Sequence, residues 1–109
     1  MSYDIWTEAE QRDGEENADV DALDWNYTYN VQPMTDRAGL RSLNLLNGVN
    51  AQVASLALAT VIDRMADDPS GYRALNPANG WGDYDTFLGR LRDLREHLLT
   101  VPKATVRVG

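Results

Sequence analysis

Apolar residues recur at helical spacing in two long stretches of the chain. The first runs from Ala51 to Ala66, and the second begins at Tyr84 and continues through Leu98. Apolar side chains that repeat every three or four residues line one side of a helix. The spacing therefore predicts two amphipathic helices. Their inward-facing residues are Val53, Ala54, Ala57, Leu58, Val61, Ile62 and Met65 in the first, and Tyr84, Phe87, Leu88, Leu91, Leu94 and Leu98 in the second.

Short polar side chains that favour helix N-termini stand in front of both stretches. Asn50 precedes the first and Asp83 precedes the second. Such side chains accept hydrogen bonds from the free N–H groups of the first turn. Asp68 followed by proline predicts a further short helix over residues 69–74, and residues 34–38 predict another.

Alternation of apolar and polar residues marks both ends of the chain. Ser2 to Glu8 alternates, and so do residues 104–108. This period of two is typical of a half-buried strand. The pattern predicts a strand at each end, and pairing of these two strands is an attractive arrangement. The side chains expected on the buried side are Tyr3, Ile5 and Thr7 in the first strand and Ala104, Val106 and Val108 in the last.

The region between the first strand and the helices gives weaker signals. Residues 10–17 are polar and predict a loop, and residues 19–24 predict a weak second strand. Residues 25–32 alternate, which favours a strand that ends in a loop. The alternative is a helix capped by Asn26 or Thr28, although Pro33 disfavours helical geometry in the residue before it.

These elements predict an α+β fold. Strands at both ends flank two main helices, and 109 residues fit a single domain spanning residues 1–109. The natural two-layer arrangement packs the two helices on one face of a small, mostly antiparallel sheet of three or four strands.

Charge and composition narrow the classes of function. The net charge is −7, and residues 1–24 carry nine acidic residues and one arginine. This balance argues against a nucleic acid polymer as partner, because such binding needs several cations. There is no cysteine, and no apolar run reaches the roughly 20 residues that span a bilayer. With no signal pattern at its start, the chain is expected in the cytoplasm, without a membrane partner.

Two stretches fit neither a helix nor a plain strand, and both are rich in asparagine and aromatic residues. In residues 76–84, glycines flank Trp81, so the backbone can adopt positive φ on both sides of the indole. One interpretation is a structured loop with Trp81 in the core. The other is a ligand-facing loop, in which Trp81 or Tyr84 stacks on a ring and Asn76 or Asn79 binds its polar edge.

The second unusual stretch, residues 25–34, places three neutral hydrogen-bonding side chains on one side if it is extended: Asn26, Thr28 and Asn30. These groups suit recognition of an uncharged polar group or the satisfaction of a neighbouring loop. The functional interpretation makes this stretch one wall of a site whose other wall is the Trp81 loop.

Catalytic signals are weak. His97 is the only histidine and borders the apolar side of its predicted helix. Asp83 and Asp85 are two residues apart and would not face each other on a helix. Arg90, Arg92 and Arg95 are expected to face solvent, and the alternative is that Arg92 and Arg95 reach a phosphate. The sequence contains no phosphate-binding or metalloprotease motif, so we expect a non-enzymatic protein without a cofactor or metal.

The two stretches resemble motifs of a family of small uncharacterised proteins from actinobacterial phages and bacteria. The family shares N-[YI]-T-x-N-x-x-x-M and NPxNGWGxY. The chain supplies Asn26-Tyr27-Thr28-Tyr29-Asn30 with Met34, and it supplies Asn76 to Tyr84 as NPANGWGDY. The resemblance spans about residues 25–108. It implies that both stretches belong to one feature and is compatible with a phage or prophage origin, but it implies no activity.

The sequence thus favours a small-ligand-binding protein that sequesters a nucleotide-like molecule, in the host cytoplasm if it is phage-encoded. The predicted ligand-binding residues are Asn26, Thr28, Asn30, Asn76, Asn79, Trp81 and Tyr84. The alternative is a protein–protein interaction module, either a homodimer or an inhibitor of a host protein. It would act through the acidic N-terminal edge and Trp6, since an acidic surface steers a basic partner.

Overall fold

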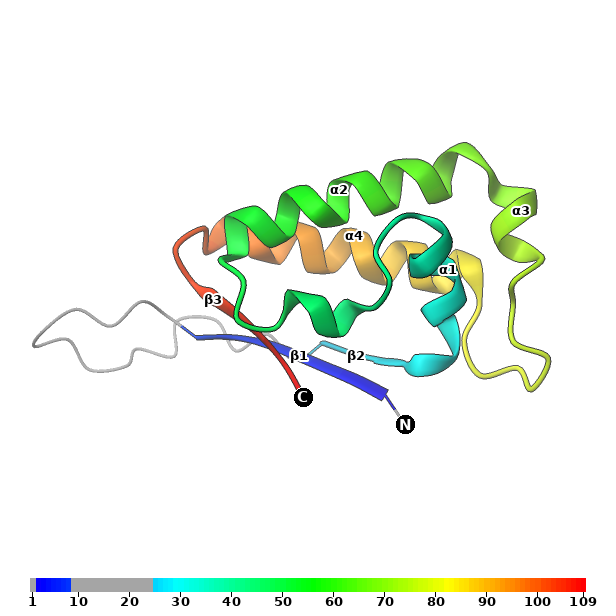
Figure 1. The fold of residues 1–109 in the computed structure, drawn as a ribbon, viewed down its shortest axis with the longest axis horizontal. Coiled ribbons are helices and arrows are strands. Elements are labelled where there is room, and N and C mark those ends of the chain that lie inside the picture. The colour runs from blue at the N-terminus through cyan, green and yellow to red at the C-terminus, as the bar shows by residue number, and fades with distance from the viewer. Residues whose placement is uncertain (1, 9–24) are drawn as a thin grey trace, which may run out of the picture.

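Two long antiparallel helices lie over one face of a three-stranded sheet (Figure 1). The computed structural model describes residues 2–8 and 25–109. The predicted loop over residues 10–17 and the predicted strand over residues 19–24 lie outside this range. In chain order the elements are β1 (Ser2–Glu8), β2 (Trp25–Thr28), the 3-10 turn η1 (Tyr29–Val31), α1 (Gln32–Arg37), the 3-10 turn η2 (Leu43–Leu46), α2 (Ala51–Asp67), α3 (Pro69–Arg73), α4 (Tyr84–Thr100) and β3 (Thr105–Val108).

The N-terminal strand is the centre of the sheet. The strand order is β2-β1-β3, and both pairings are antiparallel. Ile5 lies opposite Trp25 on one side and Val108 on the other. The predicted pairing of the terminal strands is therefore confirmed, as is the α+β class with α2 and α4 packed on each other and on the sheet.

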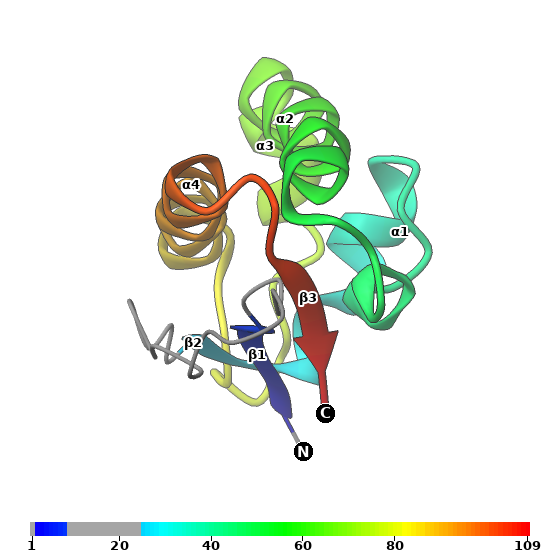
Figure 2. The same ribbon diagram turned by 90° about the vertical axis from the view of Figure 1, so that its left-hand side faces the viewer.

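The predicted alternation divides β1 between two environments. Tyr3 and Ile5 are buried beneath the helices, whereas Asp4 and Trp6 are exposed on the opposite face. None of the described helices covers this opposite face (Figure 2). By alternation and register, the outer face carries Ser2, Asp4, Trp6, Glu8, Asn26, Thr28, Thr105 and Arg107.

Both long helices begin at the predicted caps. The Asn50 side chain accepts hydrogen bonds from the N–H groups of Gln52 and Val53, and the Asp83 side chain accepts one from Thr86. Their buried residues form one core with the sheet. Those in α2 are Ala51, Ala54, Ser55, Leu58, Val61, Ile62 and Met65, and those in α4 are Tyr84, Phe87, Leu88, Leu91, Leu94 and Leu98.

The prediction was wrong for Val53, which is 57% exposed. The buried side of α2 includes Ala51 and Leu58, and Val53 lies two residues beyond Ala51. Two residues rotate a helix by about 200°, which turns Val53 away from the core. Ala51 and Ser55 take the buried positions instead.

The segment after β2 combines both of the alternatives left open by its sequence. The strand ends at Thr28, whose hydroxyl then caps η1 by accepting from the Asn30 N–H. Helix α1 follows directly and begins at Gln32, so the expectation that Pro33 opposes helix there was wrong. Proline is tolerated in the first turn because its missing N–H would have no partner within the helix.

A stack of aromatic and cationic side chains joins α3 to α1 and α4. The rings of Tyr72 and Tyr84 stack with centroids 6.2 Å apart. The Arg37 guanidinium lies 5.0 Å from the Tyr72 ring centroid, and that of Arg73 lies 5.3 Å from the Tyr84 ring centroid. Arg73 also donates two hydrogen bonds to Asp85, at 2.8 and 3.2 Å.

This ion pair predicts a small loss of stability in acid. The hydrogen bonds from Arg73 hold the pKa of Asp85 below its ordinary value of 3.8. A lowered folded-state pKa contributes stability that is present above the ordinary pKa and is lost as the pH falls through the folded-state pKa. We expect the stability of Asp85→Asn to fall less than that of the parent protein as the pH is lowered. Midpoints of urea unfolding between pH 2 and pH 6 measure this difference. Asp93→Asn, at an exposed position of the same helix, should leave the profile of the parent; identical profiles for the two variants would contradict the prediction.

Candidate functional site

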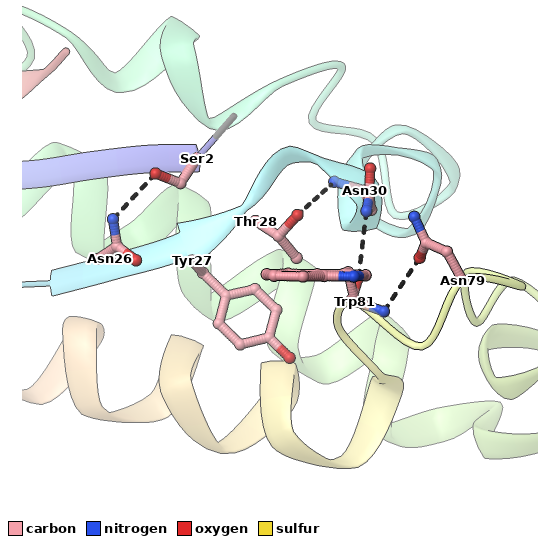
Figure 3. Close-up of a pocket in the computed structure, with 7 residues that line it drawn as sticks. All are labelled: Ser2, Asn26, Tyr27, Thr28, Asn30, Asn79 and Trp81. Atoms are coloured by element: carbon pink, nitrogen blue, oxygen red, sulfur yellow. Dashed lines mark hydrogen bonds between the residues drawn. The ribbon is translucent and has the colours of Figure 1, made fainter.

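An open pocket of about 670 Å³ lies where β2 ends (Figure 3). It is formed by the outer face of the sheet and by the loop before α4. These two walls are the two unusual stretches of the sequence, which lie about 50 residues apart in the chain. The lining residues are Ser2, Asn26, Tyr27, Thr28, Asn30, Asn79 and Trp81.

Close packing holds the two walls together. Gly82 has φ of +96°, and a Cβ at this position would lie 2.7 Å from the Thr28 methyl group and 3.0 Å from Val31 Cγ1. The Tyr27 hydroxyl accepts a hydrogen bond from the Asp83 N–H at 3.2 Å and donates to its carbonyl at 3.4 Å. The Tyr27 ring stacks on Phe87 at 5.2 Å. The loop is thus anchored to β2 by its backbone, without use of the Trp81 ring.

Trp81 is 70% exposed, so the interpretation that it fills the core was wrong. Gly80 and Gly82 both have positive φ, and this backbone path turns the indole out of the protein. Figure 3 shows the ring beside Thr28 and Tyr27, at the border of the pocket. An exposed indole bordering a pocket is available to stack on a bound ring.

Tyr84 and Asn76 have structural contacts instead of the predicted contacts with a ligand. Tyr84 is 2% exposed, and its hydroxyl donates to the Met65 carbonyl at 2.7 Å. The Asn76 side-chain oxygen accepts from the Tyr84 N–H at 2.8 Å, and Asn76 does not line the pocket. Burial of Tyr84 excludes it as a stacking surface, because it belongs to the apolar side of α4.

Five of the seven predicted residues do converge on the pocket: Asn26, Thr28, Asn30, Asn79 and Trp81. The sequence missed Ser2 and Tyr27. Ser2 enters because the register of β1 and β2 places it opposite Thr28. Only that register, which the sequence leaves undetermined, could have indicated it.

Most polar side chains of the pocket form hydrogen bonds with neighbouring protein groups. The Asn26 amide nitrogen donates to Asp4 at 2.6 Å and to Ser2 at 3.0 Å. The Asn30 amide nitrogen donates to the Trp81 carbonyl at 3.4 Å, and the Asn79 side-chain oxygen accepts from the Trp81 N–H at 3.0 Å. These bonds leave one polar atom of each amide for a ligand.

The lining side chains are neutral, and no lysine or arginine is among them. The nearby guanidinium of Arg90 does not line the pocket. It donates a hydrogen bond to the backbone carbonyl of Asn26 at 3.1 Å and lies 5.4 Å from the Trp25 ring centroid. The expectation that Arg90 simply faces solvent was therefore wrong. It joins α4 to the edge of the sheet, and the Trp25 indole N–H in turn donates to the Arg90 carbonyl at 2.8 Å.

The other candidate residues lie apart from the pocket. His97 is half-buried in the C-terminal half of α4, and Asp85 is paired with Arg73. Of the acidic N-terminal edge, the structure describes Asp4 and Glu8, and Glu8 pairs with Arg107 at 3.2 Å. Among residues 2–8 and 25–109, no group of three metal-binding side chains could hold an ion.

Fold and pocket together define a two-layer α+β protein with an open pocket at the end of β2, beside the uncovered face of its sheet. No protein-family model, curated protein or solved structure matches the chain. The resemblance to the phage and actinobacterial family therefore stays a prediction. In the described part of the chain, no helix combines the length and apolar character needed to cross a bilayer.

Proposed function

We propose that this protein binds, without transforming it, a small polar molecule that carries a flat ring, of the nucleotide-like class. The observation that carries the proposal is the convergence of an exposed indole and four neutral hydrogen-bonding side chains on one pocket. The four side chains are Asn26, Thr28, Asn30 and Asn79.

The size and chemistry of the pocket support this class of ligand. Sites for small molecules have volumes of roughly 300–1,000 Å³, and this pocket has about 670 Å³. Stacking of a base on an aromatic side chain contributes about 1–3 kcal/mol. An asparagine side chain both donates and accepts hydrogen bonds, which matches the edge of a base, where donors and acceptors stand side by side.

The lining side chains favour binding over catalysis. Within residues 2–8 and 25–109, the lining side chains include no histidine, lysine, cysteine or carboxylate that would act as a general base or nucleophile. A role in sequestering a host molecule would fit a phage origin, with which the sequence resemblance is compatible. The alternative is a protein-interaction edge. Most of its acidic residues lie outside the described residues, and the described ranges contribute to it the indole of Trp6, 41% exposed on the outer face of β1.

Titration calorimetry with a panel of the four common nucleosides, their 5′-monophosphates and free bases tests the proposal. We expect at least one compound to bind with a stoichiometry of one. Because a ligand at 100 times its Kd stabilises the folded state by about 2.7 kcal/mol, the same compound should raise the melting temperature. Absence of both heat and a melting shift across the whole panel would remove the proposed function.

A further inference from the structure

The three asparagine amides of the pocket have orientations that their partners dictate. The Asp4 carboxylate only accepts hydrogen bonds, so Asn26 must turn its Nδ2 toward it. The Trp81 carbonyl also only accepts, so Asn30 turns its Nδ2 toward that group. The Trp81 N–H only donates, so Asn79 turns its Oδ1 toward it. Each amide therefore has one predetermined atom left for a ligand.

The remaining atoms form a defined pattern of donors and acceptors. With respect to the hydrogen bonds among the described residues, Asn26 and Asn30 keep their Oδ1 atoms, which accept, and Asn79 keeps its Nδ2, which donates. Thr28 accepts from the Asn30 N–H at 3.3 Å, which leaves its hydroxyl hydrogen as a second donor. Figure 3 shows the Asn26 oxygen turned away from Ser2 and the Asn79 nitrogen turned away from the Trp81 backbone. A ligand in this pocket must present N–H or O–H groups to Asn26 and Asn30.

The charges around the pocket disfavour a phosphate. Among the described residues no cation lines the pocket, and the nearby Arg90 is bound to the Asn26 backbone carbonyl. The exposed Asp4 carboxylate lies 2.6 Å from the Asn26 amide nitrogen. A phosphate within about 8 Å of Asp4 would be repelled with little screening at physiological ionic strength.

We infer that the pocket selects an unphosphorylated nucleoside or free base by reading an N–H donor on the edge of that base. The Asn26 side-chain oxygen Oδ1 accepts from this donor, and Asp4 acts as a positioning residue that keeps this oxygen turned outward. This inference rests on the proposed function and narrows it to the neutral, donor-bearing members of the nucleotide-like class.

The first test compares each of the four common nucleosides with its 5′-monophosphate by calorimetry on the unmodified protein. We expect the preferred nucleoside to bind at least about tenfold more tightly than its monophosphate at low salt, and the gap to narrow as salt increases. Equal or tighter binding of the monophosphate overturns the inference and leaves the proposed function standing. Absence of binding by every compound overturns both.

The second test removes the N–H donors of the base by methylation. The matched analogues are N6,N6-dimethyladenosine, N4,N4-dimethylcytidine, N1,N2,N2-trimethylguanosine and N3-methyluridine. We expect the analogue of the preferred nucleoside to bind about tenfold more weakly or worse, because the Asn26 side-chain oxygen is left without its donor. An analogue that binds as tightly as its parent overturns the inference.

The third test separates the orientation of Asn26 from simple steric exclusion of the methyl group. The variant Asp4→Asn has a carboxamide that can donate or accept, so Asn26 is free to turn either polar atom toward the ligand. In this variant the methylation penalty should fall to less than about threefold, whereas a steric penalty would persist unchanged and contradict the role of Asp4. Asp63→Asn makes the same charge change at an exposed position on α2 and should keep the full penalty. Melting temperatures of both variants establish that they fold.

Discussion

Replacing Gly82 by alanine should lower the free energy of unfolding by about 2–5 kcal/mol. Gly82 has φ of +96°, and left-handed backbone costs a residue with a Cβ about 1–2 kcal/mol. The added methyl group would also lie 2.7 Å from the Thr28 methyl group and 3.0 Å from Val31 Cγ1. Overpacking of this kind costs about 1–3 kcal/mol, because neither neighbour is the free end of a flexible side chain.

Gly80 provides a matched control for this substitution. Its φ is +74°, but a Cβ there would meet no atom within 4 Å. Gly80→Ala should therefore lower the free energy of unfolding only by the cost of left-handed backbone for a residue with a Cβ, about 1–2 kcal/mol. Urea unfolding of the two variants measures the difference. Equal losses would show that the loop does not depend on its close approach to β2.

Replacing Trp81 by alanine should weaken binding of the preferred ligand by about 5- to 150-fold. This range corresponds to the 1–3 kcal/mol that stacking of a base on an aromatic ring contributes. Stability should change by less than about 0.5 kcal/mol, because the indole is 70% exposed and does not anchor the loop. Calorimetric titration with the preferred ligand, combined with urea unfolding, measures both effects.

Trp6 offers the control for the loss of an exposed indole. It lies on the outer face of β1, is 41% exposed and does not line the pocket. Trp6→Ala should leave the Kd within about twofold of the parent protein, well short of the loss expected from removing a stacked ring. Undiminished affinity in the Trp81 variant would exclude stacking on this residue as the basis of binding.

The elements of the fold were largely predictable because their signals are local. Asn50 and Asp83 mark helix starts through hydrogen bonds that span three residues. The alternation in residues 2–8 predicted both the strand and its buried side. Val53 shows the limit of this approach, because its spacing of four residues from Ala57 fits the helical pattern in the sequence although no neighbour in the described ranges covers its side of the helix.

The candidate site was predictable as a pair of stretches but not residue by residue. Asparagine and tryptophan in residues 76–81 fit no helix period, which set the loop apart. Tyr84 was assigned both to the ligand and to the apolar side of α4, and the structure places it in the core. Asp4 and Ser2 were missed, because their link to Asn26 depends on strand register.

The α+β class, the helix starts and the two unusual stretches follow from the order of residues, because hydrophobic period, capping and glycine conformation all act over a few residues. That the stretches meet, that Trp81 faces outward and that Asp4 orients Asn26 follows from the folded arrangement. These outcomes depend on packing between segments that lie more than 20 residues apart, such as Gly82 against Thr28. The order of residues within either stretch does not specify such contacts.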